Sequence, residues 1–160
     1  MSHILESAEA LKKMLPSDKT ICLVGGCFDL IHVGHLHLLE YASTLENLLV
    51  VAVLSDGYIR GYKDTGRPVI NQKQRAAMVA SIRFVDRVYI SDQSPNSSST
   101  LCVLRPDSVV FGIESGREEE LSKRIAQVRA SVPKTKVRLL ARYDEEEIST
   151  GYIIDKIRKG

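Results

Sequence analysis

The stretch TICLVGGCFDLIHVGHLHLLEYA, residues 20–42, passes from an apolar run through a glycine pair into a segment rich in histidine. Its first five residues are mostly β-branched or apolar, which favours a buried strand. The part from His35 to Leu45 is a helix candidate. A strand that leads through a glycine turn into a helix is typical of α/β proteins.

The same alternation continues along the chain. Apolar runs without strict polar alternation predict strands that are covered on both faces. The expected strands are Thr20–Val24, Leu48–Leu54, Arg87–Ser91, Ser108–Phe111 and Val137–Ala141. The expected helices are residues 2–15, His35–Leu45, Asn71–Arg83, Pro95–Leu104, Arg117–Ser131 and Thr150–Lys159. We therefore expect a Rossmann-like open parallel sheet with helices on both faces, in which ligands bind beyond the carboxyl ends of the strands.

Two of these helices have recognisable start signals. Asn71 is a good N-cap, and Gln74 stands where it would complete a capping box. Ser94 followed by Pro95 predicts an N-cap and a first helical residue. The polar, glycine-containing stretch Gly61–Pro68 predicts a loop.

Size and charge limit the classes of function. A chain of 160 residues is expected to form a single domain, with its core over residues 20–158. The net charge of +2 comes without a basic block, which gives no support to a nucleic-acid surface. No apolar run reaches the roughly 20 residues of a membrane span, and the N-terminus lacks a signal-peptide pattern. Three cysteines without a Cys-x-x-Cys pair indicate reduced thiols, a cytoplasmic protein and no zinc site.

The segment after the first strand has the chemistry of a phosphate site. Backbone N–H groups at the start of a helix lack intrahelical partners and bind anions. Gly34 removes a side chain where a phosphate needs close approach. His32 and His35 each offer a ring N–H and can carry charge near neutral pH, which suits the transition state of phosphoryl transfer.

Two other interpretations of the histidine pair remain open. A spacing of three residues allows His32 and His35 to share a helix face and bind a metal, with Asp29 as the only close third ligand. Both can also be structural histidines. The intervening glycine and the Gly-Gly turn favour the phosphate site, and we expect no metal ligand in the protein.

The segment GGCFDLIHVGHLHLLEYA resembles the G-x-F-D-x-x-H-x-G-H signature of the cytidylyltransferase-like nucleotidyltransferases. The segments VLSDGYIRGYK, RPVINQKQR, SIRFVDRVYIS and EISTGYIIDKI resemble that family in order and spacing, so the resemblance covers nearly the whole chain. It implies an enzyme in which a phosphate ester attacks the α-phosphate of a nucleoside triphosphate and pyrophosphate leaves. It also implies Mg²⁺ bound with the nucleotide, no covalent enzyme intermediate and a possible homodimer.

The resemblance also implies roles for individual residues. His32, His35 and Lys63 match catalytic positions, and Lys63 also matches a position on the acceptor. Asp29 and Arg75 match substrate-binding positions, although an ion pair that orders the loop is the alternative for Arg75. The residues that match nucleotide contacts are Gly26, Cys27, Phe28, Gly34, Arg83, Ser149 and Thr150.

The sequence departs from the family pattern at three places. The acidic run Asp144–Glu147 precedes Ser149, where it would repel a triphosphate unless it points to solvent or helps to hold Mg²⁺. Gly151 stands where many relatives have threonine. The segment Phe111–Gly116 retains only Glu114 as an acid, although this region helps to read the acceptor in relatives.

The base and the acceptor therefore stay open. KDTGRPVINQKQR resembles heptose 1-phosphate adenylyltransferases, which use ATP, whereas SIRFVDRVYIS and EIST resemble glycerol-3-phosphate cytidylyltransferases, which use CTP. Phosphopantetheine adenylyltransferases usually have threonine where this chain has His32, and class I aminoacyl-tRNA synthetases need far more chain. A catalytically weak nucleotide-binding regulatory module is the alternative from another class.

Overall fold

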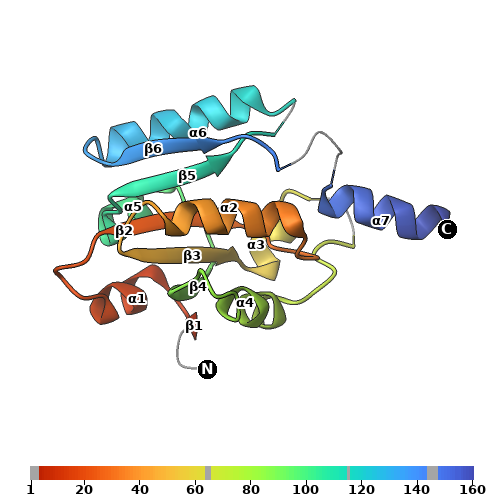
Figure 1. The fold of residues 1–160 in the computed structure, drawn as a ribbon, viewed down its shortest axis with the longest axis horizontal. Coiled ribbons are helices and arrows are strands. Elements are labelled where there is room, and N and C mark those ends of the chain that lie inside the picture. Colours follow the sequence, from red (N-terminus) through yellow and green to blue (C-terminus); the bar gives the residue numbers. More distant parts are fainter. Residues whose placement is uncertain (1–3, 64–65, 115, 144–147) are drawn as a thin grey trace.

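The computed structural model describes residues 4–63, 66–114, 116–143 and 148–160. Its centre is a six-stranded sheet in the order β1-β4-β3-β2-β5-β6, and every pair of neighbouring strands is parallel. The strands are β1 (Ile4–Leu5), β2 (Ile21–Gly26), β3 (Leu48–Leu54), β4 (Arg87–Ser91), β5 (Ser108–Gly112) and β6 (Lys136–Leu140). The open parallel sheet expected from the sequence is confirmed (Figure 1).

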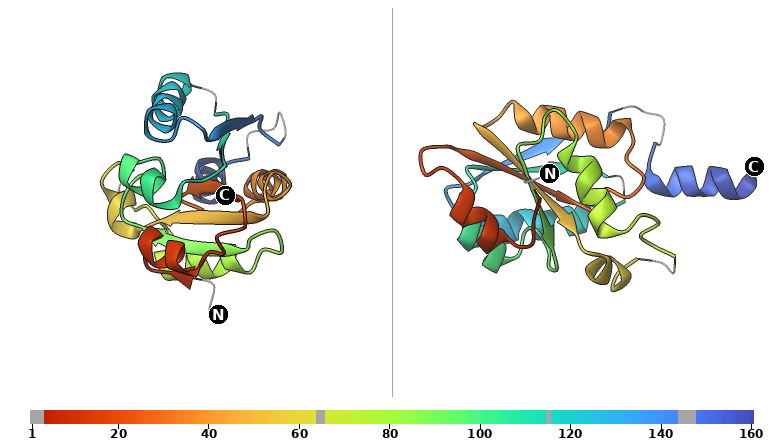
Figure 2. Two further views of the ribbon diagram at one scale, coloured as in Figure 1. Left: turned by 90° about the vertical axis from the view of Figure 1, so that its left-hand side faces the viewer. Right: turned by 90° about the horizontal axis from the view of Figure 1, so that it is seen from below.

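Helices cover both faces of the sheet, as Figure 2 shows. The helices α1 (Ala8–Met14), α5 (Ser98–Leu104) and α6 (Glu118–Ser131) pack on one face. The helices α2 (Val33–Ser43) and α4 (Gln72–Ala80) pack on the other. The short helix α3 (Asp56–Arg60) follows β3, and α7 (Thr150–Lys159) projects from the sheet's carboxyl edge (Figure 1).

The central strand β2 contributes to two separate cores. Ile21 and Leu23 belong to the core under α1, α5 and α6, whereas Cys22 and Val24 belong to the core under α2 and α4. Successive side chains of a strand point to opposite faces, so each face of β2 is covered. This explains why β2 reads as a continuous apolar run.

The strand order creates a crevice at the end of β2. The chain moves from β2 through β3 to β4 in one direction, whereas β5 and β6 lie on the other side of β2. Ligands of open α/β sheets bind at such a reversal. The crossing segment between β4 and α5 passes close over this point, because a Cβ on Gly25 would lie 2.2 Å from Cγ of Pro95.

The N-terminal expectation is corrected by the structure. Instead of one helix over residues 2–15, the described part forms β1 and then α1, which Ser7 caps by accepting a hydrogen bond from the N–H of Ala10 at 3.1 Å. Strand β1 pairs with β4, with Ile4 opposite Val88. A strand of two residues is too short to leave a periodic pattern, so only the neighbouring strand defines it.

Other helices also differ from expectation. Helix α2 runs from Val33 to Ser43 rather than from His35 to Leu45, and α6 begins at Glu118 rather than at Arg117. Helix α5 begins after Ser97, whose hydroxyl accepts from the N–H of Thr100, so Ser94 is not its N-cap. Residues from Pro95 to Ser97 form a turn instead. Helix α3 was not expected, and α4 ends at Ala80 rather than Arg83. The N-cap at Asn71 is confirmed by its acceptance from the N–H of Gln74 at 3.1 Å.

The length and polarity of the helices bear on whether any of them could span a membrane. Among the residues that the structure describes, no helix has the length and apolar character needed to cross a bilayer.

Candidate functional site

A cavity of about 590 Å³ lies at the carboxyl edge of the sheet. Its lining includes the end of β2, the start of α2, residues around α3, the turn before α5, the start of α6 and the start of α7. The sequence-derived candidates Gly26, Cys27, Phe28, Asp29, His32, Gly34, His35, Lys63, Ser149 and Thr150 all line it. The fold thus gathers residues that are far apart in the sequence around one space.

The loop between β2 and α2 has an unusual backbone. Phe28 and Leu30 have φ values of 52° and 50°, in the left-handed region that non-glycine residues rarely adopt. Phe28 is buried, and a Cβ on Gly26 would lie 3.1 Å from its ring. The second glycine of the pair therefore makes room for the phenylalanine ring, which holds the strained loop in place.

The two histidines stand together at the start of α2. His32 is the N-cap of this helix, and its ring centroid lies 4.0 Å from that of His35. The backbone N–H of His32 donates to Nδ1 of His35 at 3.3 Å. A neutral imidazole carries its proton on the other nitrogen when Nδ1 accepts. His35 is therefore a fixed donor through Nε2–H.

Burial keeps both rings neutral in the free protein. It lowers the pKa of His35 to about 3, with the charges of His32 and Lys63 adding to the effect. Burial, followed by the charge of Arg142, also lowers the pKa of His32. The sequence suggested that the histidines can be charged near neutral pH. In the site without a ligand, the lowered pKa values favour the neutral rings. The site offers neutral N–H donors instead.

The Nδ1 atom of His32 is buried and has no hydrogen-bond partner among the described residues. Such atoms are rare in folded proteins and indicate a missing ligand or water. Gly34 is explained by the same ring, because a Cβ at this position would lie 3.1 Å from the imidazole of His32. The glycine makes room for the histidine ring as well as for any phosphate.

Asp29 is used inside the protein. Its carboxylate is 1% exposed, forms an ion pair of 2.9 Å with Nε of Arg67, and accepts from the N–H groups of Val69 and Ile70. These contacts fix the segment that leads into α4. Asp29 thus positions this segment, and because it also lines the cavity, its contact with the substrate stays a prediction.

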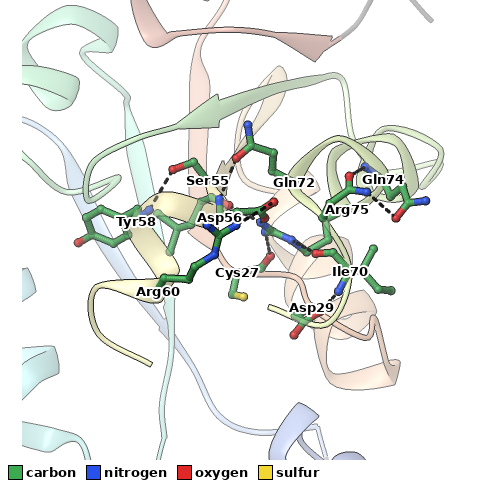
Figure 3. Close-up of polar contacts among 12 residues, drawn as sticks. Cys27, Asp29, Ser55, Asp56, Tyr58, Arg60, Ile70, Gln72, Gln74 and Arg75 are labelled. Atoms are coloured by element: carbon green, nitrogen blue, oxygen red, sulfur yellow. Dashed lines mark hydrogen bonds and ion pairs between the residues drawn. The ribbon is translucent and has the colours of Figure 1, made fainter. Parts of the chain in front are cut away.

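Arg75 is likewise buried and fully engaged, as Figure 3 shows. Its guanidinium donates to the carbonyl of Ile70, to that of Leu54 at 2.7 Å and to that of Cys27, and it pairs with Asp56 at 2.7 Å. It does not line the cavity. The ion-pair alternative for Arg75 therefore describes it better than substrate binding. It joins α4, the end of β3 and the histidine loop.

Arg83 lies at the wrong edge of the sheet for a nucleotide contact. Helix α4 runs back from the carboxyl edge, so residues beyond its end lie near the starts of β3 and β4, where Asp86 accepts from the N–H of Leu49. The Arg83 side chain is 81% exposed and pairs with Glu40 at 3.9 Å. The expectation that Arg83 binds the nucleotide is corrected by this antiparallel return of the helix.

The start of α7 closes the cavity from the far end of the chain. The Ser149 hydroxyl accepts from the N–H of Tyr152 at 3.1 Å, which confirms a capping role. The Thr150 hydroxyl donates to the carbonyl of Asp29 at 2.6 Å. This bond places the free N–H groups of α7 beside the histidine loop. The acidic run 144–147 lies outside the described residues.

Several lining residues were not expected from the sequence. They are the aromatic side chains Tyr58, Tyr62 and Tyr143, the amide of Asn96, and the charged side chains Arg67, Arg117, Glu120 and Arg124. A glycine- and tyrosine-rich segment after a strand, as at residues 57–62, was the available signal for the first two. No short-range signal points to the α6 residues.

The described residues contain no group of three or more His, Cys, Asp or Glu side chains arranged to hold a metal ion.

The sequence and the fold of this chain are similar to those of several known proteins. The chain is 34% identical over 155 residues to the bifunctional protein HldE of Campylobacter jejuni subsp. doylei, which covers 97% of this chain but only 31% of that protein. A lipopolysaccharide core biosynthesis protein from Thermoplasma volcanium superposes with a TM-score of 0.64 at 25% identity, over 79% of this chain and 99% of that one. A pantothenate synthetase from Thermus thermophilus superposes with a TM-score of 0.64 at 16% identity, over 98% and 69%, which concerns the fold alone.

The family model described as cytidylyltransferase-like matches residues 23–156. That range includes the histidine pair, Lys63 and the start of α7. Because the match spans most of the chain and includes the residues that meet at the crevice, this chain belongs to the cytidylyltransferase-like family of nucleotidyltransferases.

Proposed function

We propose that the protein transfers an adenylyl group from ATP to a heptose 1-phosphate and releases pyrophosphate. The observation that carries this proposal is the pair of histidine rings, 4.0 Å apart at the start of α2, with Nδ1 of His35 accepting from the backbone so that Nε2–H is left as a donor. Two donors at one point suit the α-phosphate, which gains negative charge during transfer.

The reaction forms one bond and breaks one bond at the α-phosphorus. An oxygen of the acceptor phosphate attacks, and the bond to the β-phosphate oxygen breaks as pyrophosphate leaves on the opposite side. The starts of α2 and α7, with Arg142, supply N–H groups and positive charge for the triphosphate. Mg²⁺, which we propose binds with the nucleotide, would neutralise phosphate charge.

Two observations support ATP and a heptose phosphate over CTP and glycerol 3-phosphate. The Campylobacter jejuni relative reported above carries the name HldE, and residues 63–75 resemble heptose 1-phosphate adenylyltransferases. In that segment the structure gives Arg67 a defined place, as the ion-pair partner of Asp29. Because the chain spans 31% of the HldE protein, the activity of that whole protein is not transferred here.

The test is pyrophosphate release with Mg²⁺, from ATP and CTP in parallel, against heptose 1-phosphate, glycerol 3-phosphate and phosphocholine. We expect turnover only with ATP and heptose 1-phosphate. His35→Ala should reduce kcat by about 100-fold or more, because one transition-state donor is worth that much in comparable sites. ATP binding should persist in this variant, measured by calorimetry.

Lys63 offers a second test with a matched control. Lys63 lines the cavity, whereas Lys73 is exposed on α4 outside it. Lys63→Ala should lower kcat/KM by about 10-fold or more, since an electrostatic contact to a phosphate is lost. Lys73→Ala should match the wild type. ATP binding without turnover for any acceptor would favour the regulatory module instead.

A homodimer is the remaining part of the proposal. Helix α7 has no buried residue among those described, and Ile157 is 72% exposed. Light scattering at micromolar concentration should give twice the mass of one chain, and a mass of one chain would remove this part.

A further inference from the structure

The turn before α5 carries a polar side chain with no partner. Asn96 is 8% exposed and lines the cavity. Its backbone N–H donates to the Ser94 hydroxyl at 3.3 Å, but no hydrogen bond among the described residues uses its side-chain amide. Because this amide lines the cavity and no described protein group uses it, it is a candidate ligand contact.

The turn that carries Asn96 leads to the face of the sheet opposite to the helix of the histidines. Helix α2, which carries His32 and His35, packs on one face, whereas α5 and α6 pack on the other. The turn that carries Asn96 leads into α5, and α5 is tied to α6 through the bond between Ser131 and Ser98 at 3.0 Å. The cavity therefore has a phosphate end and a second end.

At the second end, formed by Tyr58, Tyr62, Asn96 and the Glu120–Arg124 ion pair, the arginines are paired, whereas the Lys63 ammonium lies 5.9 Å from the Tyr62 ring and is free to meet a phosphate. Arg124 is paired with Glu120, and Arg117 is paired with Glu114 at 3.1 Å. Tyr62 is 48% exposed and its phenol is neutral near pH 7; partial desolvation, with further contributions from Cys27 and Tyr58, raises its pKa to about 12 against the opposing charges of Arg124 and Arg117. A second dianion would have to displace these carboxylates.

Hydroxyl groups fit this end better than a further anion. An amide offers two donors and one acceptor, a phenol offers both, and an ion pair can accept and donate at once. The rings of Tyr58 and Tyr62, whose centroids are 5.3 Å apart, add apolar surface for C–H groups. Such a mixture matches a ring with several neighbouring hydroxyls.

In-line transfer places the acceptor at this end. The leaving pyrophosphate and the attacking oxygen lie on opposite sides of the α-phosphorus. If the starts of α2 and α7 hold the triphosphate, the acceptor approaches from the side of Lys63 and Tyr62. We propose that the second end binds the hydroxyl-bearing part of the acceptor and that Asn96 determines its specificity. This inference rests on the proposed function.

The first experiment measures binding without turnover. Heptose 1-phosphate and methyl phosphate, which has the phosphate but no hydroxyls, are titrated into protein saturated with α,β-methylene-ATP. For Asn96→Ala we expect the Kd of heptose 1-phosphate to rise about tenfold, the equivalent of one lost hydrogen bond, and that of methyl phosphate to stay within about twofold. Gln93→Ala, which removes an exposed amide from the same segment, should leave both values unchanged.

Steady-state kinetics give the second readout. Asn96→Ala should raise the KM for heptose 1-phosphate and leave the KM for ATP unchanged. Asn96→Ser, which keeps a polar side chain of smaller reach, should give the same pattern and serves if the alanine variant fails to fold. A raised KM or Kd for ATP alone would mean that Asn96 reads the nucleoside, and no change in any value would mean that its amide contacts only water. Either result overturns the inference.

The two proposals fail in different ways. If the wild type binds heptose 1-phosphate but does not turn it over, the proposed function fails and the binding inference stands. If the wild type binds methyl phosphate no more weakly than heptose 1-phosphate, the second end contributes nothing and the inference fails, whatever the activity.

Discussion

Two clusters of charged residues, each with some members in the cavity wall, differ in burial. The first, which we call the buried network, consists of Asp29, Arg67, Asp56 and Arg75; the side chains of Asp29 and Arg75 are fully covered. The second, the α6 row, consists of Glu114, Arg117, Glu119, Glu120, Lys123 and Arg124, whose side chains are 44–85% exposed. Both clusters pair every charge with an opposite one.

The difference between them is energetic. Removing one partner of a buried pair leaves a charge without compensation, whereas an exposed pair is replaced by water at little cost. The buried network therefore fixes the backbone of the histidine loop. The α6 row can exchange its internal bonds for bonds to a ligand. One cluster makes the site rigid, and the other leaves it adaptable.

The largest expected effect is on the buried network. Arg75→Met should lower the free energy of unfolding by about 3–5 kcal/mol, because Asp56 and three carbonyl groups lose their donor. Urea unfolding measures this. Arg60→Ala is the matched control, because Arg60 pairs with the same Asp56 at 3.9 Å from an exposed position. Equal losses in both variants would contradict the distinction.

The next effect concerns Asp29. Asp29→Asn keeps the shape of the side chain but removes the charge that faces Arg67, and one of its amide N–H groups then meets a backbone donor. We expect a loss of about 1–3 kcal/mol in unfolding free energy, since a buried group is left unsatisfied. Thermal and urea unfolding should agree, and an unchanged midpoint would show that the loop holds without this carboxylate.

A pH experiment tests burial at the histidines themselves. The pKa of His35 is about 3 in the folded protein against an ordinary 6.5, so between these pH values only the unfolded chain takes up the proton. Stability should therefore fall as pH decreases below 6.5, with a slope of up to about 1.4 kcal/mol per pH unit from this group. His35→Gln should reduce that slope and leave the behaviour above pH 7 parallel to the wild type. Identical slopes would mean that His35 is accessible to protons.

The smallest effect is expected on the α6 row. Lys123 and Glu119 approach to 2.7 Å, yet both side chains are at least 75% exposed. Lys123→Ala should change the unfolding free energy by less than about 1 kcal/mol, and even that change should shrink in high salt. A loss comparable to that of the buried network would mean that exposure does not separate the two clusters.

Local sequence signals predicted the frame of the molecule well. Strand β3 and helix α7 have the bounds expected from the sequence, and Asn71 caps α4 as expected. These features depend on neighbours within a few residues. Strand β1 was missed because it depends on pairing with β4. The late start of α5 was missed because either of two nearby serines, Ser94 or Ser97, could cap the helix.

For the candidate site, the sequence predicted where the functional residues lie better than it predicted what each of them contacts. His32, His35, Lys63, Ser149 and Thr150 do meet at one cavity. Asp29 and Arg75, assigned to the substrate, bind other parts of the chain, and Arg83 lies at the other edge of the sheet. An aspartate or arginine in a sequence carries no mark of its burial, and burial decides whether it faces a ligand or its own protein.

The sequence by itself determined the order of the five longer strands and of the helices other than α3, the place of the histidine pair and the family resemblance, because these depend on short-range pattern and on residue identity. Only the tertiary structure decided which charged side chains are covered, which nitrogen of His35 donates and which charged side chains around the cavity are ion-paired. The bond from Thr150 to Asp29, across 121 residues, is an example. Such contacts exist only once the sheet brings distant segments to one edge, and burial there sets their electrostatics.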